Sequence, residues 1–416
     1  MKAKILLAVA LGLSGQVLAQ DSSNVRTVGV YNTPGDCFGV TISGSYAYVA
    51  DGISGLRIVD LSSPANPVEV GFYDTPGGGR SVAVSGSYAY IADVDSGLRI
   101  INISIPGSPT LTGAYITPGG ARGVSVSGNY AYVADRSSGL RVVDVSDPAS
   151  PAEEGFYDTP GYAYSVAVFG SYAYVADGGY GLRVIDVSDP ASPTEVGFYD
   201  TPGNASGVAI SGNYAYVADA AGGLRIINVS DPASPAETGY YNTAVYANFV
   251  SVAGNNAYVA DMDSGLRVIN ISAPALPTQS GYYNTTGDAY GVAFADSLIC
   301  LANGSAGLGI YQGYGAAGIA NEQVGETKFN VESLKLNVAG NQINYQIPQN
   351  GMTSLKVYNL LGQEVRTLAN EFKSAGVYGL QWNGRDAGNR KVASGVYLAR
   401  LESNGQTATG KMVIVR

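Results

Sequence analysis

Carboxylates recur along this chain at one fixed spacing, and they are the side chains with most capacity for chemistry. Six aspartates stand 42 residues apart, each ending a Tyr-Ala-Tyr-type segment, and an asparagine holds the seventh place. They are Asp51, Asp93, Asp135, Asp177, Asp219, Asp261 and Asn303. Carboxylate oxygens could ligate calcium, and a pair of carboxylates could catalyse glycoside hydrolysis. Because these acids are repeated rather than paired, the pattern favours a structural role in which each aspartate caps its own hairpin turn.

Other chemistry is limited by what the chain lacks. It contains no histidine, which excludes Ser-His-Asp and Cys-His nucleophilic sites and histidine-ligated metals. We therefore expect no catalytic residue and no cofactor, with calcium as the one alternative. The weak candidates for calcium are the two doubled acids, Asp93 with Asp95 and Asp261 with Asp263.

The elements that position these residues follow from the repeat. In one copy, Gly123–Gly128, Tyr130–Ala134, Leu140–Val145 and Glu154–Asp158 are the expected strands, separated by Gly-, Asp- and Pro-rich turns. A single copy cannot bury its own apolar surface, so the copies must pack on each other. Seven such units of 42 residues predict an all-β fold, a seven-bladed β-propeller over residues 20–312.

The two ends of the repeat region predict how the ring closes. A fourth-strand segment, Val25–Thr33, precedes any complete blade, and the last unit, Gly291–Gln312, has only three strands. The N-terminal strand should complete the last blade, so deleting residues 21–34 should destabilise the whole ring. Apolar contacts, worth roughly 1.5–3 kcal/mol per buried side chain, should hold the blades together. The repeated arginines, of which Arg57 is the first, are expected to form exposed pairs worth about 0.2–1 kcal/mol.

Two cysteines fall at the closure point. Cys37 lies just before the first blade, and Cys300 lies late in the second strand of the seventh. They could form a disulfide in an oxidising location or remain two buried thiols.

The N-terminus and the charge indicate where the protein acts. Residues 1–19 have a basic start, a short apolar core and a small-residue cleavage site between Ala19 and Gln20, which predicts a secretory signal. No segment has the length of a transmembrane helix. Residues 21–312 hold ten arginines, no lysine and 26 acids, a formal charge of −16 that makes nucleic acid a poor partner.

The third strands carry a family resemblance. Leu56-Arg-Ile-Val-Asp60, Leu140-Arg-Val-Val-Asp144 and Leu182-Arg-Val-Ile-Asp186 resemble the signature of LVIVD-repeat propellers, with Arg in place of the first Val. The resemblance implies a β-propeller, often on extracellular or surface proteins, and no defined activity.

Beyond the ring, residues 313–330 are expected to be a linker and 331–416 a small immunoglobulin-like β-sandwich. Leu355–Val365, Trp382–Asp386, Ala393–Tyr397 and the terminal Lys411–Arg416 resemble the type A sorting domain of the type IX secretion system. The resemblance implies secretion and sorting machinery as partner, and export to the outer surface of a Gram-negative-type bacterium. The residues implied as sorting signal are Lys411, Met412, Val413 and Arg416. The alternative is a plain accessory sandwich that stays attached.

Comparison of the seven copies with each other predicts a binding face. The turns on one face barely vary, whereas those on the other carry different Tyr, Arg, Ser and Asn residues, which suit adaptable recognition. The candidate ligand-binding residues are Phe38, Arg80, Arg122, Arg136, Tyr162, Tyr164, Tyr180, Tyr246 and Tyr290. The alternative is drift in unconstrained loops.

These observations favour a secreted or cell-surface, non-enzymatic propeller that recognises a protein or glycan. One alternative is an enzyme acting on extracellular polysaccharide through acidic and Tyr residues. The other is a structural component of a surface layer.

Overall fold

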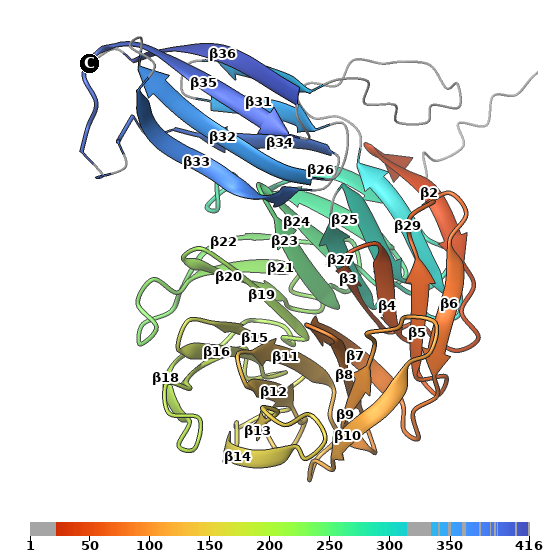
Figure 1. Cartoon of the computed structure of the whole chain (residues 1–416). Coiled ribbons are helices and arrows are strands. Elements are labelled where there is room, and N and C mark those ends of the chain that lie inside the picture. Colours follow the sequence, from red (N-terminus) through yellow and green to blue (C-terminus); the bar gives the residue numbers. More distant parts are fainter. Residues whose placement is uncertain are drawn as a thin grey trace, which may run out of the picture. The chain divides into compact units, whose positions relative to one another are not determined.

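The computed structural model describes residues 22–295 and 297–313, followed by a C-terminal part at 334–339, 342–347, 351–359, 363–373, 376–382, 384–386, 388, 390–403 and 406–414 (Figure 1). The chain divides into two compact units, Met1–Ile319 and Ala320–Arg416. The expected signal peptide, with its cleavage site at Ala19 and Gln20, lies outside the described residues, as does the expected linker apart from Gly313. The part of the chain that the structure describes contains no helix able to cross a membrane.

The first unit is a ring of seven antiparallel blades, as the 42-residue period predicts. The first strands are β3 (Gly39–Ser43), β7 (Gly79–Ser85), β11 (Gly123–Ser127), β15 (Ser165–Phe169), β19 (Gly207–Ser211), β23 (Phe249–Ala253) and β27 (Gly291–Ala295). The second strands are β4 (Tyr46–Ala50), β8 (Tyr88–Asp93), β12 (Tyr130–Ala134), β16 (Tyr172–Ala176), β20 (Tyr214–Ala218), β24 (Asn256–Ala260) and β28 (Leu298–Ala302). The third strands are β5 (Leu56–Asp60), β9 (Gly97–Asn102), β13 (Leu140–Asp144), β17 (Leu182–Asp186), β21 (Leu224–Asn228), β25 (Leu266–Asn270) and β29 (Leu308–Gly313). The fourth strands are β6 (Val68–Tyr73), β10 (Thr110–Tyr115), β14 (Ala152–Tyr157), β18 (Thr194–Tyr199), β22 (Ala236–Tyr241), β26 (Thr278–Tyr283) and, in the seventh blade, β2 (Val25–Tyr31).

The N-terminal strand closes the ring, which confirms the predicted clasp. Strand β2 pairs antiparallel with β29, from Val25 opposite Gly313 to Tyr31 opposite Leu308. In Figure 1 the red β2 lies beside the cyan β29, although nearly 300 residues separate them in sequence. A further two-residue strand, β1 (Ser22–Ser23), pairs with β26 of the sixth blade, a contact that the repeat did not predict. The N-terminal segment therefore holds both the sixth and the seventh blades.

The hydrophobic core of the ring lies between the blades. Each cluster of buried side chains joins the second and third strands of one blade to those of the next, as Val142 of β13 and Val175 of β16 illustrate. The closure joint is built in the same way, since Cys300 and Ile310 of the seventh blade pack with Val49 of the first. Apolar burial thus continues around the whole ring, including the joint that the N-terminal strand closes.

Backbone bridges reinforce every joint between blades. The residue after each repeated Asp or Asn pairs with a residue of the turn that leads into the next blade, and both hydrogen bonds of Arg136 with Ala163 measure 3.0 Å. The seven bridges are Gly52–Gly79, Val94–Ala121, Arg136–Ala163, Gly178–Ala205, Ala220–Ala247, Met262–Ala289 and, at the closure, Gly304–Cys37. These bridges place the second-to-third turns and the blade-to-blade turns, which carry the variable residues, on one face of the ring.

The repeated aspartates tie adjacent blades together. The carboxylate of Asp177 accepts hydrogen bonds from the Thr159 hydroxyl at 2.5 Å and the Gly161 amide at 2.8 Å, both in the turn from the preceding blade. The expectation that each aspartate caps its own hairpin is therefore wrong. Burial raises the pKa of Asp177, and the bonds from Thr159 and Gly161 and the charge of Arg183 oppose that rise.

The repeated arginines are not exposed, contrary to the prediction from the sequence. Arg183 is 5% exposed and its Nε lies 4.0 Å from Asp177, whose side chain is fully buried. Its guanidinium also reaches Asp200 at 2.7 Å and stacks 4.5 Å from the centre of the Phe198 ring. All six repeated arginines lie beside a buried aspartate, and five of them also stack on an outer aromatic ring, while Arg99 faces Ala114; they are part of the core rather than surface charges.

The seventh copy shows that the aspartate and the arginine act as a unit. Where Asn303 replaces the aspartate, Gly309 replaces the arginine. A side chain at Gly309 would collide with the Tyr311 ring, whose hydroxyl accepts a hydrogen bond from the Asn303 amide. An uncharged set of residues therefore occupies the place of the charged pair.

The thiols of Cys37 and Cys300 are free and fully buried in the closure cluster, with no bond between them. Burial raises the pKa of the Cys300 thiol to about 12 and that of Cys37 well above its usual range. Both thiols are therefore protonated at neutral pH and shielded from reagents.

The second unit is a two-sheet β-sandwich. One sheet has the order β30 (Lys335–Ala339), β31 (Gln342–Ile347), β34 (Gly376–Gln381), and the other β33 (Glu364–Lys373), β32 (Gly351–Asn359), β35 (Gly395–Ser403), β36 (Gln406–Ile414). Its core includes Trp382, Ile343, Leu355 and Met412. The sequence predicts strands at 343–347, 353–358, 377–382, 395–401 and 410–415, which correspond to β31, β32, β34, β35 and β36; it does not predict β30 and β33.

The implied sorting signal is partly a strand of that sandwich. Met412 of β36 is buried in the core, whereas Lys411 beside it is exposed. The backbone of Val413 continues β36, and Arg416 lies outside the described residues. Loss of Met412 would therefore disturb the fold as well as any signal.

A double-mutant cycle tests the buried pair. Arg183→Met should cost about 3–5 kcal/mol of unfolding free energy at pH 7, because it leaves the Asp177 carboxylate buried without its cation. Adding Asp177→Asn, the residue found at Asn303, should recover at least ~1 kcal/mol of that loss. Urea unfolding followed by circular dichroism measures the coupling.

The matched control is Arg183→Met with Asp200→Asn, since Asp200 is largely exposed and its coupling should stay below about 1 kcal/mol. Equal couplings in the two cycles would contradict the structural role given to the aspartate.

Thiol reactivity tests the closure joint. Cys37 and Cys300 should resist a thiol reagent in the folded protein and react at the rate of global unfolding, because both are buried at the clasp. The measurement is labelling by mass spectrometry across a urea series. Fast labelling in the absence of denaturant would show that the clasp opens by itself.

Candidate binding site

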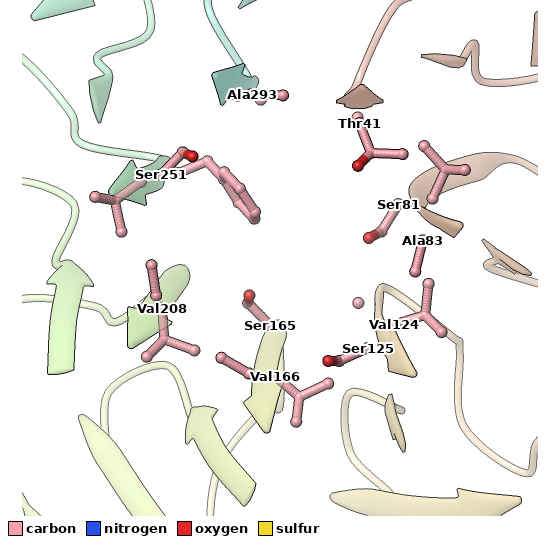
Figure 2. A pocket seen from close by; sticks show the side chains of 18 of the residues that line it. Thr41, Ser81, Ala83, Val124, Ser125, Ser165, Val166, Val208, Ser251 and Ala293 are labelled. Carbon is pink, nitrogen blue, oxygen red and sulfur yellow. The ribbon is translucent and has the colours of Figure 1, made fainter. Parts of the chain in front are cut away.

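The first strands of the seven blades surround a central cavity of about 530 Å³. The middle residue of each first strand is small, which keeps the channel open along its axis. Those residues are Thr41, Ala83, Ser125, Ala167, Ala209, Ser251 and Ala293. Figure 2 shows Thr41, Ala83, Ser125, Ser251 and Ala293 arranged around the open centre. The wall therefore offers hydroxyl groups and methyl groups.

The residues just before the first strands form what we call the mouth ring. Its members are Phe38, Arg80, Arg122, Tyr164, Ser206, Asn248 and Tyr290, and all seven line the cavity. They occupy one repeat position on the face that carries the inter-blade bridges. Because the blades are closely similar, the differences between copies converge on one small space.

Arginine and aromatic side chains pair within the mouth ring. The Arg80 guanidinium carbon lies 3.6 Å from the centre of the Phe38 ring, and that ring meets Tyr290 edge-on at 4.9 Å. Arg122 lies 4.6 Å from the centre of the Tyr164 ring. Such cation–π contacts hold both guanidinium groups in place without an acidic partner.

The mouth ring also makes a polar contact. The Asn248 amide donates a 2.6 Å hydrogen bond to the Tyr290 carbonyl, which ties the sixth blade to the seventh.

The electrostatics of the mouth differ from those of the blades. Burial lowers the pKa of Arg80, Arg122 lowers it further, and Tyr290 and Asp36 oppose the shift. Burial likewise lowers the pKa of Arg122, with Tyr164 opposing and Arg136 adding to the shift. Positive charge is thus concentrated within a strongly acidic repeat region.

The other predicted residues are placed unequally around this site. Tyr162 is 54% exposed and stacks on Tyr164, so it extends the mouth outward. Tyr246 is near enough to influence the pKa of Arg122. Tyr180 instead contacts Arg183 of the blade interior, away from the residues that line the cavity.

Two members of the mouth ring, Ser206 and Asn248, were not among the predicted site residues, although they stand in the same repeat column. Phe249 was also missed. It lines the cavity at a position where the other copies have only Gly or Ser, which was the signal that could have found it.

The doubled acids do not form a cation cage. Asp93 is buried and accepts bonds from Thr75 and Gly77, and Asp261 likewise accepts from the backbone of the preceding turn. Asp95 and Asp263 are exposed. Among the described residues, no three metal-ligating side chains come together.

Comparison with known proteins identifies both units. Six segments match the LVIVD repeat, at residues 34–75, 76–117, 118–159, 160–201, 202–243 and 245–285, and together they cover more than half of the chain. This chain belongs to the LVIVD repeat family. The resemblance read from the third strands is confirmed, and the seventh blade of this LVIVD protein, which uses the N-terminal strand, lies outside the matched segments. Residues 339–406 match the FlgD Ig-like domain.

Solved structures share the fold at low identity. A chain of the mitotic checkpoint complex is 12% identical with a TM-score of 0.59, over 75% of this chain and 99% of that one. Streptogramin B lyase is 14% identical with a TM-score of 0.55, over 69% and 97%. PorZ of Porphyromonas gingivalis, an essential surface component of its type IX secretion system, is 12% identical with a TM-score of 0.50. The match covers 93% of this LVIVD chain and 60% of PorZ. No curated protein matches the chain.

Proposed function

We propose that this LVIVD protein is a non-enzymatic recognition propeller that binds a surface protein or glycan at its mouth ring. The observation that carries the proposal is the contrast within the repeat. The copies share their strands and, in six of the seven, an Asp-centred joint, yet the position at the mouth of the cavity holds Phe, Arg, Tyr, Ser or Asn. Aromatic and arginine side chains in a concave site are the usual anchors of binding energy.

The chemistry of the cavity supports binding rather than acid–base catalysis. Its lining consists of apolar, hydroxyl, amide and guanidinium groups. The carboxylates whose pKa burial raises include Asp135 and Asp219. Asp135 accepts a hydrogen bond from the Gly119 amide, and Asp219 accepts from the Thr201 hydroxyl and the Gly203 amide, all at the blade joints. Acids that are held in this way stabilise the frame and cannot serve a substrate in the channel.

The second unit supports a location at the cell surface. We propose that it directs export through a type IX pathway, as its resemblance to type A sorting domains implies. The match to the FlgD Ig-like domain and the similarity to PorZ agree with this role. Recognition would then take place outside the cell, where a ligand can reach the channel mouth.

A fourfold substitution tests the proposal. Replacing Arg80, Arg122, Tyr162 and Tyr164 by Ala should reduce binding to glycan arrays and to cell-envelope extracts at least tenfold, because it removes the anchors of the mouth. Array fluorescence and pull-down with the full chain measure the loss.

The control carries four Ala substitutions in exposed turns between first and second strands, at Ser87, Asn129, Ser171 and Asn213. Both proteins should keep the wild-type melting temperature. Undiminished binding by the mouth variant would mean that the differences between copies are drift.

A further inference from the structure

Three arginines stand apart from the rest of the ring. Of the ten in residues 21–312, six occupy the repeated position beside an aspartate, and Arg26 bonds Gln312. The remaining three are Arg80, Arg122 and Arg136, and within the described part of the chain none of them forms an ion pair. They are close enough to one another that Arg122 and Arg136 both lower the pKa of Arg80.

Arg136 is held there against backbone preference. Its φ angle is +51°, in the left-handed region, and three of its counterparts, Gly52, Gly178 and Gly304, are glycines with the same sign of φ. Ala220 and Met262 occupy the same repeat position with φ angles of +52° and +41°, so the conformation belongs to this turn, and a non-glycine residue adopts it at a cost in free energy. The structure gives Arg136 no intramolecular ion pair as compensation.

The Arg136 side chain also has unused hydrogen-bonding capacity. Its Nε is buried and has no hydrogen-bond partner. The Arg136 side chain passes so close to Gly120 that a Cβ added to this glycine would lie 3.1 Å from the Arg136 Cδ. A buried guanidinium N–H without an acceptor is costly unless a ligand supplies one. Arg57, Arg99, Arg141, Arg183 and Arg225 leave the same atom unpaired at the blade joints, so in Arg136 this N–H is a spare donor that a ligand can use.

The stacked arginines are oriented to receive such a group. At 3.6 Å from the Phe38 ring, the Arg80 guanidinium has room only to lie nearly flat on it, so its donors point sideways in the plane. Arg122 is held on Tyr164 in a similar way. Forked, preoriented N–H groups match the two oxygens of a carboxylate.

We propose that the mouth ring, together with Arg136 beside it, binds the carboxylates of an acidic glycan, with Arg80, Arg122 and Arg136 as the anion-binding groups; this rests on the proposed recognition function. The cavity of about 530 Å³ suits a few sugar rings. A folded protein would need roughly 800 Å² of its surface in contact. The amide of Asn248 and the hydroxyls of Thr41 and Ser125, which line the cavity, can bond sugar hydroxyls.

The test is calorimetric titration of the full chain with tetramers of galacturonate, glucuronate, mannuronate and guluronate. At least one should bind, its methyl ester should bind at least tenfold more weakly, and raising NaCl from about 50 to 300 mM should weaken the binding. Failure of all four uronates would overturn the inference. The recognition function would still stand if the fourfold mouth variant lost binding to envelope extracts.

The decisive variant is Arg136→Gly, because glycine occupies the same place in three other blades. It should keep or raise the melting temperature and weaken uronate binding at least tenfold. The control is Arg26→Gln, which removes the same charge from an exposed site on β2 and should leave affinity unchanged. Equal losses of uronate affinity in the two variants would show that the binding depends on general charge attraction and would contradict a specific site.

Competing ligands complete the test. Tighter binding of tetraglutamate than of any uronate would show that the ligand is an acidic peptide and not a glycan. If inorganic sulfate or phosphate displaces the uronate equally well, the site binds oxyanions in general and is not specific for carboxylates. Either result overturns the assignment made here.

Discussion

The structure depends on one constraint: no blade of this repeat can cover its own apolar faces, so the ring must close on itself. Strand β2, paired with β29, meets that requirement by completing the seventh blade, and β1 extends the same segment onto the sixth. Every core cluster of the ring spans two blades, including the one at the closure. The central channel and its mouth ring exist only because the circle is complete.

Closure of the ring does not by itself fix the positions of the seven side chains of the mouth ring. The joints between the blades fix them. A buried aspartate bonds the incoming turn, a buried arginine stands behind it, and a backbone bridge links each blade to the next. Because this frame is the same at nearly every joint, the residue before each first strand can vary without loss of fold. Recognition and stability are therefore assigned to different positions of one repeat.

Much of this could be predicted from the sequence, and the limits have physical reasons. The 42-residue period predicted seven blades, because each repeat forms one blade. The fourth-strand segment at Val25–Thr33, which precedes any complete blade, predicted the clasp, because the last repeat has no fourth strand of its own. The column of Phe38, Arg80 and Tyr290 predicted that these residues share one face, because equal repeat positions become equal places in a ring; their convergence on a central cavity was not predicted. The buried state of Arg183 could not be predicted, since it depends on the neighbouring turn and the Phe198 ring. The left-handed backbone of Arg136 could have been predicted from the glycines at the same position of three copies, whereas the stacking of Arg80 on Phe38 could not, since it joins two blades.

Native-state hydrogen exchange at β2 tests the central claim most directly. If the N-terminal strand is an integral part of the ring, its amides should exchange with the same free energy as those of β12 and β16, through unfolding of the whole propeller. Exchange of β2 at a free energy several kcal/mol lower, with β12 and β16 still protected, would contradict the account. It would show that the ring is stable without its clasp.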